Sequence, residues 1–324
     1  MRKKKVLIIG INSQDGSYLA DLLFQKDYLV YGTTRDMNTL TPQWNTKNKV
    51  DLIQINYSNA KSITKKIKDI MPDEIYNFAA LSTGEGMYRN VDEIYHLNGF
   101  FVSYILEAIR LHNKNIKFFQ ASSREVFGIP QEFPQNEKTR FLPRSPYGVA
   151  KLFSQNITRI YREYYNLFSV SGILFNHESF RRGDSFVSKK ICKAAAKIKY
   201  GSQDKLYLGD LDSTRDWGFA GDFVKAMWMM LQSENPKDYV IATGKEHSIR
   251  DLCIHAFSFF DLNYEDYVIE DKSIINREKV KVNFIGDASK INYDLGWEIK
   301  KNFKDMVYEM VKYEYEKEIT INGI

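Results

Sequence analysis

Residues 6–16 carry the sequence Val-Leu-Ile-Ile-Gly-Ile-Asn-Ser-Gln-Asp-Gly, and this stretch decides the fold. Its branched apolar run predicts a buried strand, and the polar residues after Gly10 predict a tight turn into a helix. A dinucleotide pyrophosphate binds at such a turn, on backbone N–H groups at the positive helix end. The alternative is a turn without a ligand, since Ser13 stands where a middle glycine is usual. The expected cofactor contacts are Gly10, Asn12, Ser13, Gln14, Asp15 and Gly16.

Short β-branched runs continue along the first half of the chain and alternate with longer helical patterns. The expected strands are Val6–Gly10, Leu29–Thr33, Leu52–Ile55, Glu74–Phe78, Lys117–Ala121 and Ser169–Phe175. Repeated strand–helix–strand units imply right-handed crossovers and a parallel sheet with helices on both faces. The sequence therefore predicts an α/β fold with a Rossmann-type doubly wound parallel sheet, whose carboxyl edge binds ligands.

After about Phe175 the alternation weakens and glycines separate shorter elements, which predicts a smaller, mixed α/β C-terminal lobe. We expect a Rossmann domain over residues 1–175, with 216–244 returning to it, and a substrate-binding lobe over 176–215 and 245–324. The helices expected in this half include Phe186–Lys199, Ile249–Phe260 and Lys304–Lys317, while the segments Phe219–Gln232 and Tyr239–Thr243 are expected to return to the first lobe.

Composition excludes several classes of protein. The 324 residues are 44% hydrophobic and 27% charged, with no apolar run long enough to span a bilayer. The net charge of +5 is spread among acidic residues without a basic stripe, so we expect no nucleic-acid partner. Cys192 and Cys253 lack paired spacing, which predicts reduced thiols, no metal site and a cytoplasmic location.

The residues after the second expected strand bear on cofactor choice. Thr33-Thr34-Arg35-Asp36 has no acid where the ribose hydroxyls are usually held, and Arg35 is placed to meet a 2′-phosphate. This favours NADP, although the neighbouring Asp36 opposes it and leaves NAD possible.

Tyr147 and Lys151 lie four residues apart, on one face of an expected helix. A phenol is a poor base at neutral pH, but an adjacent ammonium and a cationic nicotinamide ring favour its ionised form. The alternative is an amphipathic helix that carries the pair by chance. Ser123 and Glu125 follow the strand Lys117–Ala121, which places a hydroxyl and a carboxylate at the same sheet edge.

Together, Gly10, Gly16, Ser123, Tyr147 and Lys151 resemble the extended short-chain dehydrogenase/reductases that act on nucleotide sugars. Glu125, two residues after Ser123, is similar to the dehydratase variant. Three further segments resemble GDP-mannose 4,6-dehydratases in particular: Pro143–Lys151, Gly172–Ser179 with Arg181–Gly183, and Asp212–Gly218.

The resemblance implies a hydro-lyase that converts a GDP-sugar to its 4-keto-6-deoxy derivative by internal hydride transfer. Tyr147, held by Lys151 and Ser123, would deprotonate the C4 hydroxyl, and Glu125 would remove the C5 proton and assist loss of the C6 hydroxyl. The product would supply deoxysugars for polysaccharide. The resemblance also implies cofactor contacts from Asn56 and Ala79, a homodimer or homotetramer, and substrate contacts from Asn176, Lys190, Arg215 and Arg277.

Departures from the family pattern keep alternatives open. Arg124 replaces a usual serine or acid, and its guanidinium would favour the ionised form of Glu125 and impair its service as an acid. A nucleotide-sugar 4-dehydrogenase or epimerase is therefore the alternative, and a non-catalytic NADP-binding sensor is a remote one. Residues 83–91 do not resemble the family stretch that lines the hexose pocket, so the sugar is GDP-mannose or a relative such as a GDP-heptose.

Overall fold

The computed structural model describes residues 2–37, 44, 46–82, 88, 90–274 and 284–322. In this part of the chain a seven-stranded sheet runs in the order β10-β6-β5-β4-β1-β2-β3, with every neighbouring pair parallel. The predicted doubly wound parallel sheet is confirmed. Its strands are β1 (Lys5–Ile9), β2 (Leu29–Thr34), β3 (Asp51–Gln54), β4 (Glu74–Asn77), β5 (Lys117–Ala121), β6 (Ser169–Leu174) and β10 (Tyr239–Ile241).

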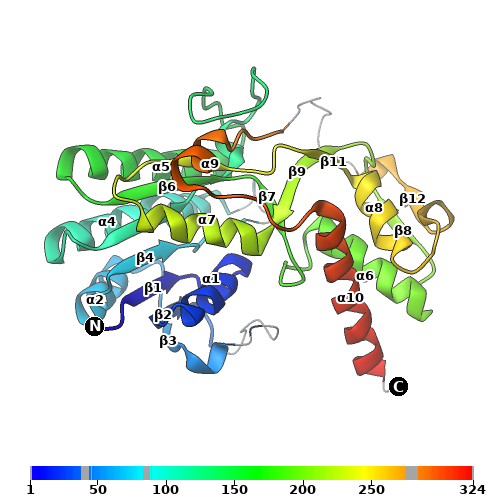
Figure 1. The fold of residues 1–324 in the computed structure, drawn as a ribbon, viewed down its shortest axis with the longest axis horizontal. Helices are drawn as coiled ribbons and strands as arrows, with labels where there is room; N and C mark the ends of the chain where they lie inside the picture. The colour runs from blue at the N-terminus through cyan, green and yellow to red at the C-terminus, as the bar shows by residue number, and fades with distance from the viewer. Residues whose placement is uncertain are drawn as a thin grey trace.

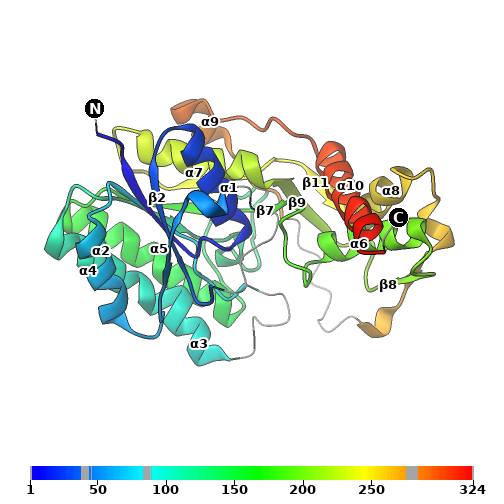
Figure 2. The same cartoon turned by 90° about the horizontal axis from the view of Figure 1, so that it is seen from below.

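Helices cover both faces of this sheet because alternate strand residues point to opposite sides (Figures 1 and 2). Val6 and Ile8 share a core with α1 (Gln14–Gln25) and α7 (Ala220–Gln232). Leu7 and Ile9 belong to the core on the other face. The helices there are α2 (Ala60–Ile70), α4 (Phe101–His112) and α5 (Pro146–Tyr165), with α3 (Val91–Tyr95) and the π-helix η3 (His96–Phe100) leading into α4.

A second lobe is built on two small sheets. Strands β7 (Asn176–Glu178), β9 (Thr214–Phe219) and β11 (Glu246–Ser248) form one, and β8 (Leu206–Leu208) pairs with β12 (Val268–Glu270) in the other. Helices α6 (Val187–Tyr200), α8 (Ile249–Ser258) and α10 (Phe303–Asn322) pack beside them (Figure 1). The remaining elements are α9 (Ser289–Leu295) and the 3₁₀ turns η1 (Lys47–Lys49), η4 (Arg124–Val126), η5 (Tyr264–Asp266) and η6 (Lys272–Ile274).

The second lobe buries both cysteines and one ion pair. Cys192 of α6 and Cys253 of α8 lie in its apolar core. Lys189 pairs with Glu314 between α6 and α10 and also donates to the carbonyl of Phe180 at 2.7 Å. Both charges of this pair therefore have a partner, which offsets the cost of burying them. Within the described ranges, no helix has the length and apolar character needed to cross a membrane.

Helix ends follow local chemistry. The Ser145 hydroxyl accepts from the backbone N–H of Gly148 and Pro146 occupies the first turn, which fixes the start of α5. Ser248 and Asp251 form a capping box at the start of α8. The predicted helices agree to within a few residues, except that α10 runs to Asn322 rather than Lys317. The division into residues 1–175, 216–244 and the rest stays a prediction.

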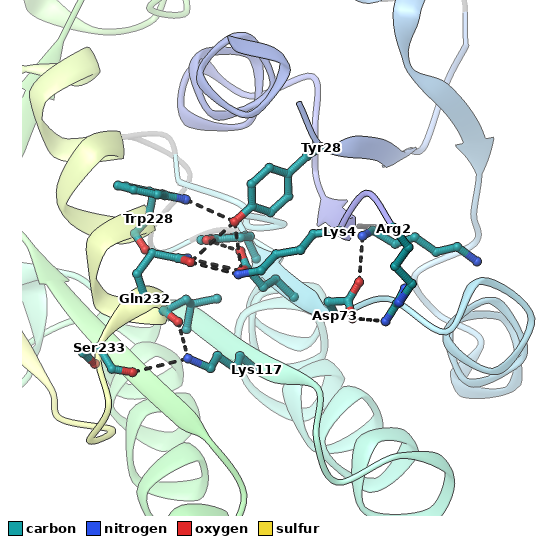
Figure 3. Close-up of polar contacts among 12 residues, drawn as sticks. Arg2, Lys4, Tyr28, Asp73, Lys117, Trp228, Gln232 and Ser233 are labelled. Atoms are coloured by element: carbon teal, nitrogen blue, oxygen red, sulfur yellow. Dashed lines mark hydrogen bonds and ion pairs between the residues drawn. The ribbon is translucent and has the colours of Figure 1, made fainter. Parts of the chain in front are cut away.

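The amino ends of the strands are tied together around Glu74, which is 1% exposed. Its carboxylate accepts from the hydroxyls of Tyr28 at 3.1 Å and Tyr76 at 2.9 Å, from Lys4 Nζ at 3.0 Å and from Gln232 Nε2 at 3.2 Å. Figure 3 shows Lys4, Tyr28 and Gln232 pointing toward one another at this edge. Burial, followed by the Glu74 carboxylate, raises the pKa of both tyrosines. These hydroxyls therefore stay protonated and remain donors.

Candidate active site

Two adjoining cavities open at the carboxyl ends of the strands, where a doubly wound sheet binds ligands. The larger, of about 390 Å³, is lined by residues of the β1–α1 turn, η4, α5 and β7. The smaller, of about 310 Å³, reaches the end of β2. Asn12, Ser13, Phe78 and Ala80 line both, so the two form one continuous groove beside the β1–α1 turn.

The β1–α1 turn is tightly packed and leaves no room for side chains at its glycines. Gly10 has φ +81°, and a Cβ there would lie 2.8 Å from the backbone N of Ala79. A Cβ on Gly16 would lie 2.7 Å from the carbonyl oxygens of Gly10 and Ile11. Ser13 caps α1 by accepting from the N–H of Gly16 at 3.0 Å. This geometry suits a phosphate group at the helix end.

Most of the expected cofactor residues line the groove, but Gly16 and Asn56 are not among its described lining residues. Gly10, Asn12, Ser13, Arg35 and Ala79 line the smaller cavity, whereas Asn12, Ser13, Gln14 and Asp15 line the larger one. Arg35 is exposed, with its Nη1 3.5 Å from Glu93 Oε1. Asn56 lines a neighbouring cavity together with Arg35, and its side-chain oxygen accepts from the N–H of Ser58 at 2.9 Å.

Tyr147 and Lys151 both line the larger cavity from the first turns of α5. Lys151 Nζ lies 5.7 Å from the centre of the Tyr147 ring. It donates to the carbonyl oxygen of Ala121, at the end of β5, at 2.8 Å. The helix spacing therefore places the two groups on one face, as the sequence predicts, with the ammonium fixed to the sheet edge.

Burial sets the protonation of this pair. It raises the pKa of Tyr147 to about 12, although a hydrogen bond with Ser123 opposes the shift. It lowers the pKa of Lys151 to about 8, opposed by the charge of Asp15. The sequence predicts a lowered Tyr147 pKa. In the structure, the cost of burying the phenolate is larger than the stabilisation that its neighbours give to that charge, so the pKa is raised. Lys151 can release or hold a proton near neutral pH.

Ser123 and Glu125 lie at the start of η4, directly after β5. The Ser123 hydroxyl contacts Tyr147 and also accepts from the N–H of Glu125 at 3.3 Å. Glu125 is buried and lines the same cavity as Tyr147. The strand end therefore places a hydroxyl, a phenol and a carboxylate around one space.

Arg124 is the neighbour that most changes this site. Its Nη2 lies 2.9 Å from Glu125 Oε1, its Nε donates to Asn176 Oδ1 at 2.8 Å, and its guanidinium lies 4.0 Å from the centre of the Phe284 ring. Burial lowers the pKa of Arg124, with the Glu125 charge opposing this shift. The ion pair expected from the sequence is therefore present, and it links Glu125 to Asn176.

A second buried pair joins the β1–α1 turn to β7. His177 Nε2 lies 3.0 Å from both carboxylate oxygens of Asp15, and His177 Nδ1 lies 2.7 Å from the carbonyl oxygen of Phe175. Burial would lower the pKa of His177, but Asp15 outweighs it and raises that pKa. The pKa of Asp15 is correspondingly lowered, because His177 outweighs burial. The sequence analysis assigns no role to His177, although it lies within a segment resembling the dehydratases.

The predicted substrate residues separate into three groups. Asn176 lines the larger cavity. Lys190 is exposed, donates to the carbonyl of Tyr207 at 3.0 Å and is not among the described residues lining that cavity. Arg215 is also outside the described lining, with its guanidinium 5.7 Å from the centre of the Phe284 ring, and Arg277 lies outside the described residues. Lining residues without a predicted role include Arg181, Arg182 and Phe186.

Sequence comparison now places the chain. The sequence model of the family described as GDP-mannose 4,6 dehydratase matches residues 7–310. The chain belongs to the GDP-mannose 4,6-dehydratase family. GDP-mannose 4,6 dehydratase 1 of Arabidopsis thaliana is 41% identical, over 97% of this chain and 90% of that protein. The human GDP-mannose 4,6 dehydratase is 37% identical over 96% and 91%, and that of Vibrio cholerae serotype O1 is 36% identical over 98% and 95%.

Solved structures similar to this family member share its fold at low sequence identity. The dTDP-glucose 4,6-dehydratase of Bacillus anthracis, in complex with NAD, matches with a TM-score of 0.81 and 19% identity over 97% of each chain. RMD of Pseudomonas aeruginosa, complexed with NADPH, matches with a TM-score of 0.80 and 19% identity over 97% of this chain and 98% of that one.

Proposed function

We propose that this protein is a GDP-sugar 4,6-dehydratase that uses Ser123, Glu125, Tyr147 and Lys151 to convert a GDP-hexose to its 4-keto-6-deoxy derivative. Membership of the GDP-mannose 4,6-dehydratase family carries the reaction class. The observation that carries the residue roles is that all four line one cavity beside the β1–α1 turn. GDP-mannose is the first substrate to test.

The β1–α1 turn fits a nicotinamide dinucleotide, because the absence of side chains at Gly10 and Gly16 lets the backbone pack tightly at the start of α1, where a diphosphate would bind. Asn12, Ser13, Gln14 and Asp15 would hold its diphosphate, and Gly10, Arg35, Asn56 and Ala79 would surround its adenosine half. When bound, the cofactor supplies reversible hydride transfer, taking hydride from C4 and returning it to C6. Arg35 supports NADP over NAD because a guanidinium pairs well with a 2′-phosphate.

Proton transfers are the task of the protein's own side chains. Tyr147 acts as the base toward the C4 hydroxyl after its own phenol proton has left to the amine of Lys151, which can take up a proton near neutral pH, while Ser123 holds the phenol oxygen. Formation of the C4 ketone acidifies the C5 proton, which Glu125 removes. Glu125 then returns that proton to the C6 oxygen as the C6–O bond breaks, and one water leaves. Protonation of C5, balanced by the proton that Tyr147 took from the C4 hydroxyl, and return of hydride to C6 complete the 4-keto-6-deoxy product.

The test is incubation with GDP-mannose and related GDP-sugars, a GDP-heptose among them, followed by mass spectrometry of the products. Loss of one water is the expected result. Glu125→Gln should retain C4 oxidation and lose dehydration by a factor of about 10²–10⁴. A Glu125→Gln protein that dehydrates at the unsubstituted rate would contradict the assigned role.

A second function, a nucleotide-sugar 4-dehydrogenase or epimerase, is favoured by one observation, the Arg124–Glu125 ion pair at 2.9 Å. A carboxylate that is paired with a guanidinium is less free to pass a proton to a departing oxygen. Loss of two hydrogens would identify oxidation, and unchanged mass with altered stereochemistry would identify epimerisation.

We infer a homodimer or homotetramer from an exposed apolar face on α5 and the end of η3. Phe100 and Phe153 contact each other with ring centres 5.3 Å apart, and both are exposed. Ile160 and Tyr164 continue the exposed face along α5. Apolar groups gathered in this way are typical of an interface between subunits. Sedimentation equilibrium of the pure protein measures the assembly.

A further inference from the structure

Arg124 is buried, and its guanidinium nitrogens have different partners. The residue is 8% exposed and lines the larger cavity. Nε is bound to Asn176 and Nη2 to Glu125, but Nη1 has no hydrogen-bond acceptor among the described residues. Leaving a buried charged donor without an acceptor is costly, so a ligand that supplies one is favoured. Nη1 is therefore available to an acceptor on a ligand in that cavity.

The surroundings of Nη1 indicate which oxygen this is. Nη1 and Nη2 share one carbon in a planar fork, and Nη2 is held 2.9 Å from Glu125 Oε1. An acceptor for Nη1 therefore binds the same planar group that holds the Glu125 carboxylate. In the proposed function, Glu125 acts on C5, and C6 is the atom bonded directly to C5.

We propose that Arg124 binds the C6 oxygen of the hexose through Nη1 and assists its departure as water. The assignment rests on the proposed function and adds a group to it. As the C6–O bond breaks, negative charge gathers on the oxygen, and the Nη1–H donor stabilises it. The proton that completes the water comes from C5 through Glu125, because an arginine side chain does not give up its proton in proteins. Arg124 therefore stays charged throughout.

Two substitutions distinguish donation by Nη1 to the C6 oxygen from the effect of a positive charge beside Glu125. Arg124→Lys keeps a cation beside Glu125 but loses the planar fork, and Arg124→Gln loses both. With GDP-mannose in heavy water, three partial reactions are followed: absorbance of the reduced nicotinamide, deuterium entry at C5, and loss of water by mass. We expect C4 oxidation to stay near the unsubstituted rate in both variants, and C5 exchange to stay near it in Arg124→Lys, which keeps a cation beside Glu125. Water loss should fall about 10–100-fold.

Binding provides an independent measurement that does not depend on turnover. The unsubstituted protein should bind GDP-mannose more tightly than a GDP-6-deoxyhexose, because the latter lacks the C6 oxygen. Arg124→Lys should bind both equally, which completes a double-mutant cycle between Nη1 and that oxygen. Affinity for GDP alone should not change.

Arg144→Gln is the matched control, because the Arg144 guanidinium lies 5.9 Å from the centre of the same Phe284 ring. This variant should leave the ratio of water loss to C4 oxidation unchanged. Thermal unfolding and cofactor binding verify that each variant is folded.

Several outcomes would overturn the assignment. An equal fall in all three partial reactions would show a merely structural role, and weaker binding of GDP itself would show that Nη1 serves a phosphate. Faster water loss in Arg124→Gln would show that the guanidinium restrains Glu125. If the unsubstituted protein oxidises C4 but releases no water, the proposed function fails and this role fails with it. Normal dehydration in both Arg124 variants would refute the role of Arg124 alone.

Discussion

The amino ends and the carboxyl ends of the parallel strands, here called the amino edge and the carboxyl edge, use buried polar side chains in different ways. At the amino edge, the Glu74 carboxylate accepts from Lys4, Tyr28, Tyr76 and Gln232. Figure 3 shows Lys4, Tyr28 and Gln232 gathered there. At the carboxyl edge, Arg124 retains a nitrogen without an acceptor among the described residues. Buried polar groups are normally paired, so an unpaired group that lines a cavity indicates a ligand. We therefore expect the polar groups at the amino edge to contribute stability and, under the proposed function, those at the carboxyl edge to contribute chemistry.

The largest expected effect is at the carboxyl edge. Tyr147→Phe removes the group that accepts the C4 proton, so C4 oxidation should fall by about 10²–10⁴-fold. The free energy of unfolding should change by only about 1 kcal/mol, since one buried hydrogen bond with Ser123 is lost. Absorbance of the reduced nicotinamide and denaturant unfolding measure the two quantities. If Tyr147→Phe still oxidised C4 at the unsubstituted rate, the catalytic role given to the carboxyl edge would be contradicted.

The amino edge should show the reverse pattern. Glu74→Ala leaves the Tyr28 and Tyr76 hydroxyls without their acceptor and should lower the free energy of unfolding by about 3 kcal/mol. The turnover number, measured well below the unfolding temperature, should stay unchanged. Glu163→Ala is the control, because Glu163 forms an exposed pair with Arg159 at 2.7 Å and should contribute under about 0.5 kcal/mol. A large loss of turnover in Glu74→Ala would show that the edges are coupled.

His177 tests whether the carboxyl edge also contributes stability. Because Asp15 raises the pKa of His177, the pair stabilises the fold fully below about pH 6.5 and loses this contribution as pH rises through the raised pKa. The lowered pKa of Asp15 keeps its carboxylate ionised until more acid conditions. His177→Gln should therefore lose about 1–2 kcal/mol at about pH 6 and less at about pH 9, measured by denaturant unfolding. The control is the exposed His112→Gln, which should change the free energy of unfolding by under about 0.5 kcal/mol. An equal loss at both pH values in His177→Gln would contradict the pairing.

The smallest effect belongs to an exposed group at the same edge. Arg35→Ser should weaken NADP binding about 3–10-fold, because a solvated ion pair contributes little, and should leave NAD binding unchanged. Titration with each cofactor measures both affinities. Equal weakening of NADP and NAD would show that Arg35 does not contact the 2′-phosphate.

Much of the sheet could be predicted because its information is local. The branched run Val6–Ile9 forms β1, and the polar turn after it leads into α1 as expected. Tyr147 and Lys151 lie on one helix face because a four-residue spacing dictates it. Belonging to the dehydratase family was also predictable, from segments such as Pro143–Lys151.

The electrostatics of the site were less predictable, because they depend on burial and on residues far apart in the chain. Asp15 and His177 are 162 positions apart, and no spacing rule connects them. The pKa of Tyr147 rises because its surroundings exclude water, which the sequence does not reveal. Lys190 follows a matching motif, yet its ammonium turns to the carbonyl of Tyr207.

Phe175 alone separates β6 of the large sheet from β7 of the small one. The two lobes are therefore joined here by an almost continuous strand. A rotation of the three-stranded sheet about Phe175 would move Asn176 and His177 together. His177 is hydrogen-bonded to Asp15 in the first turn of α1, so this movement would displace the start of that helix. Movement of the second lobe would in this way reach the β1–α1 turn through a single residue of backbone.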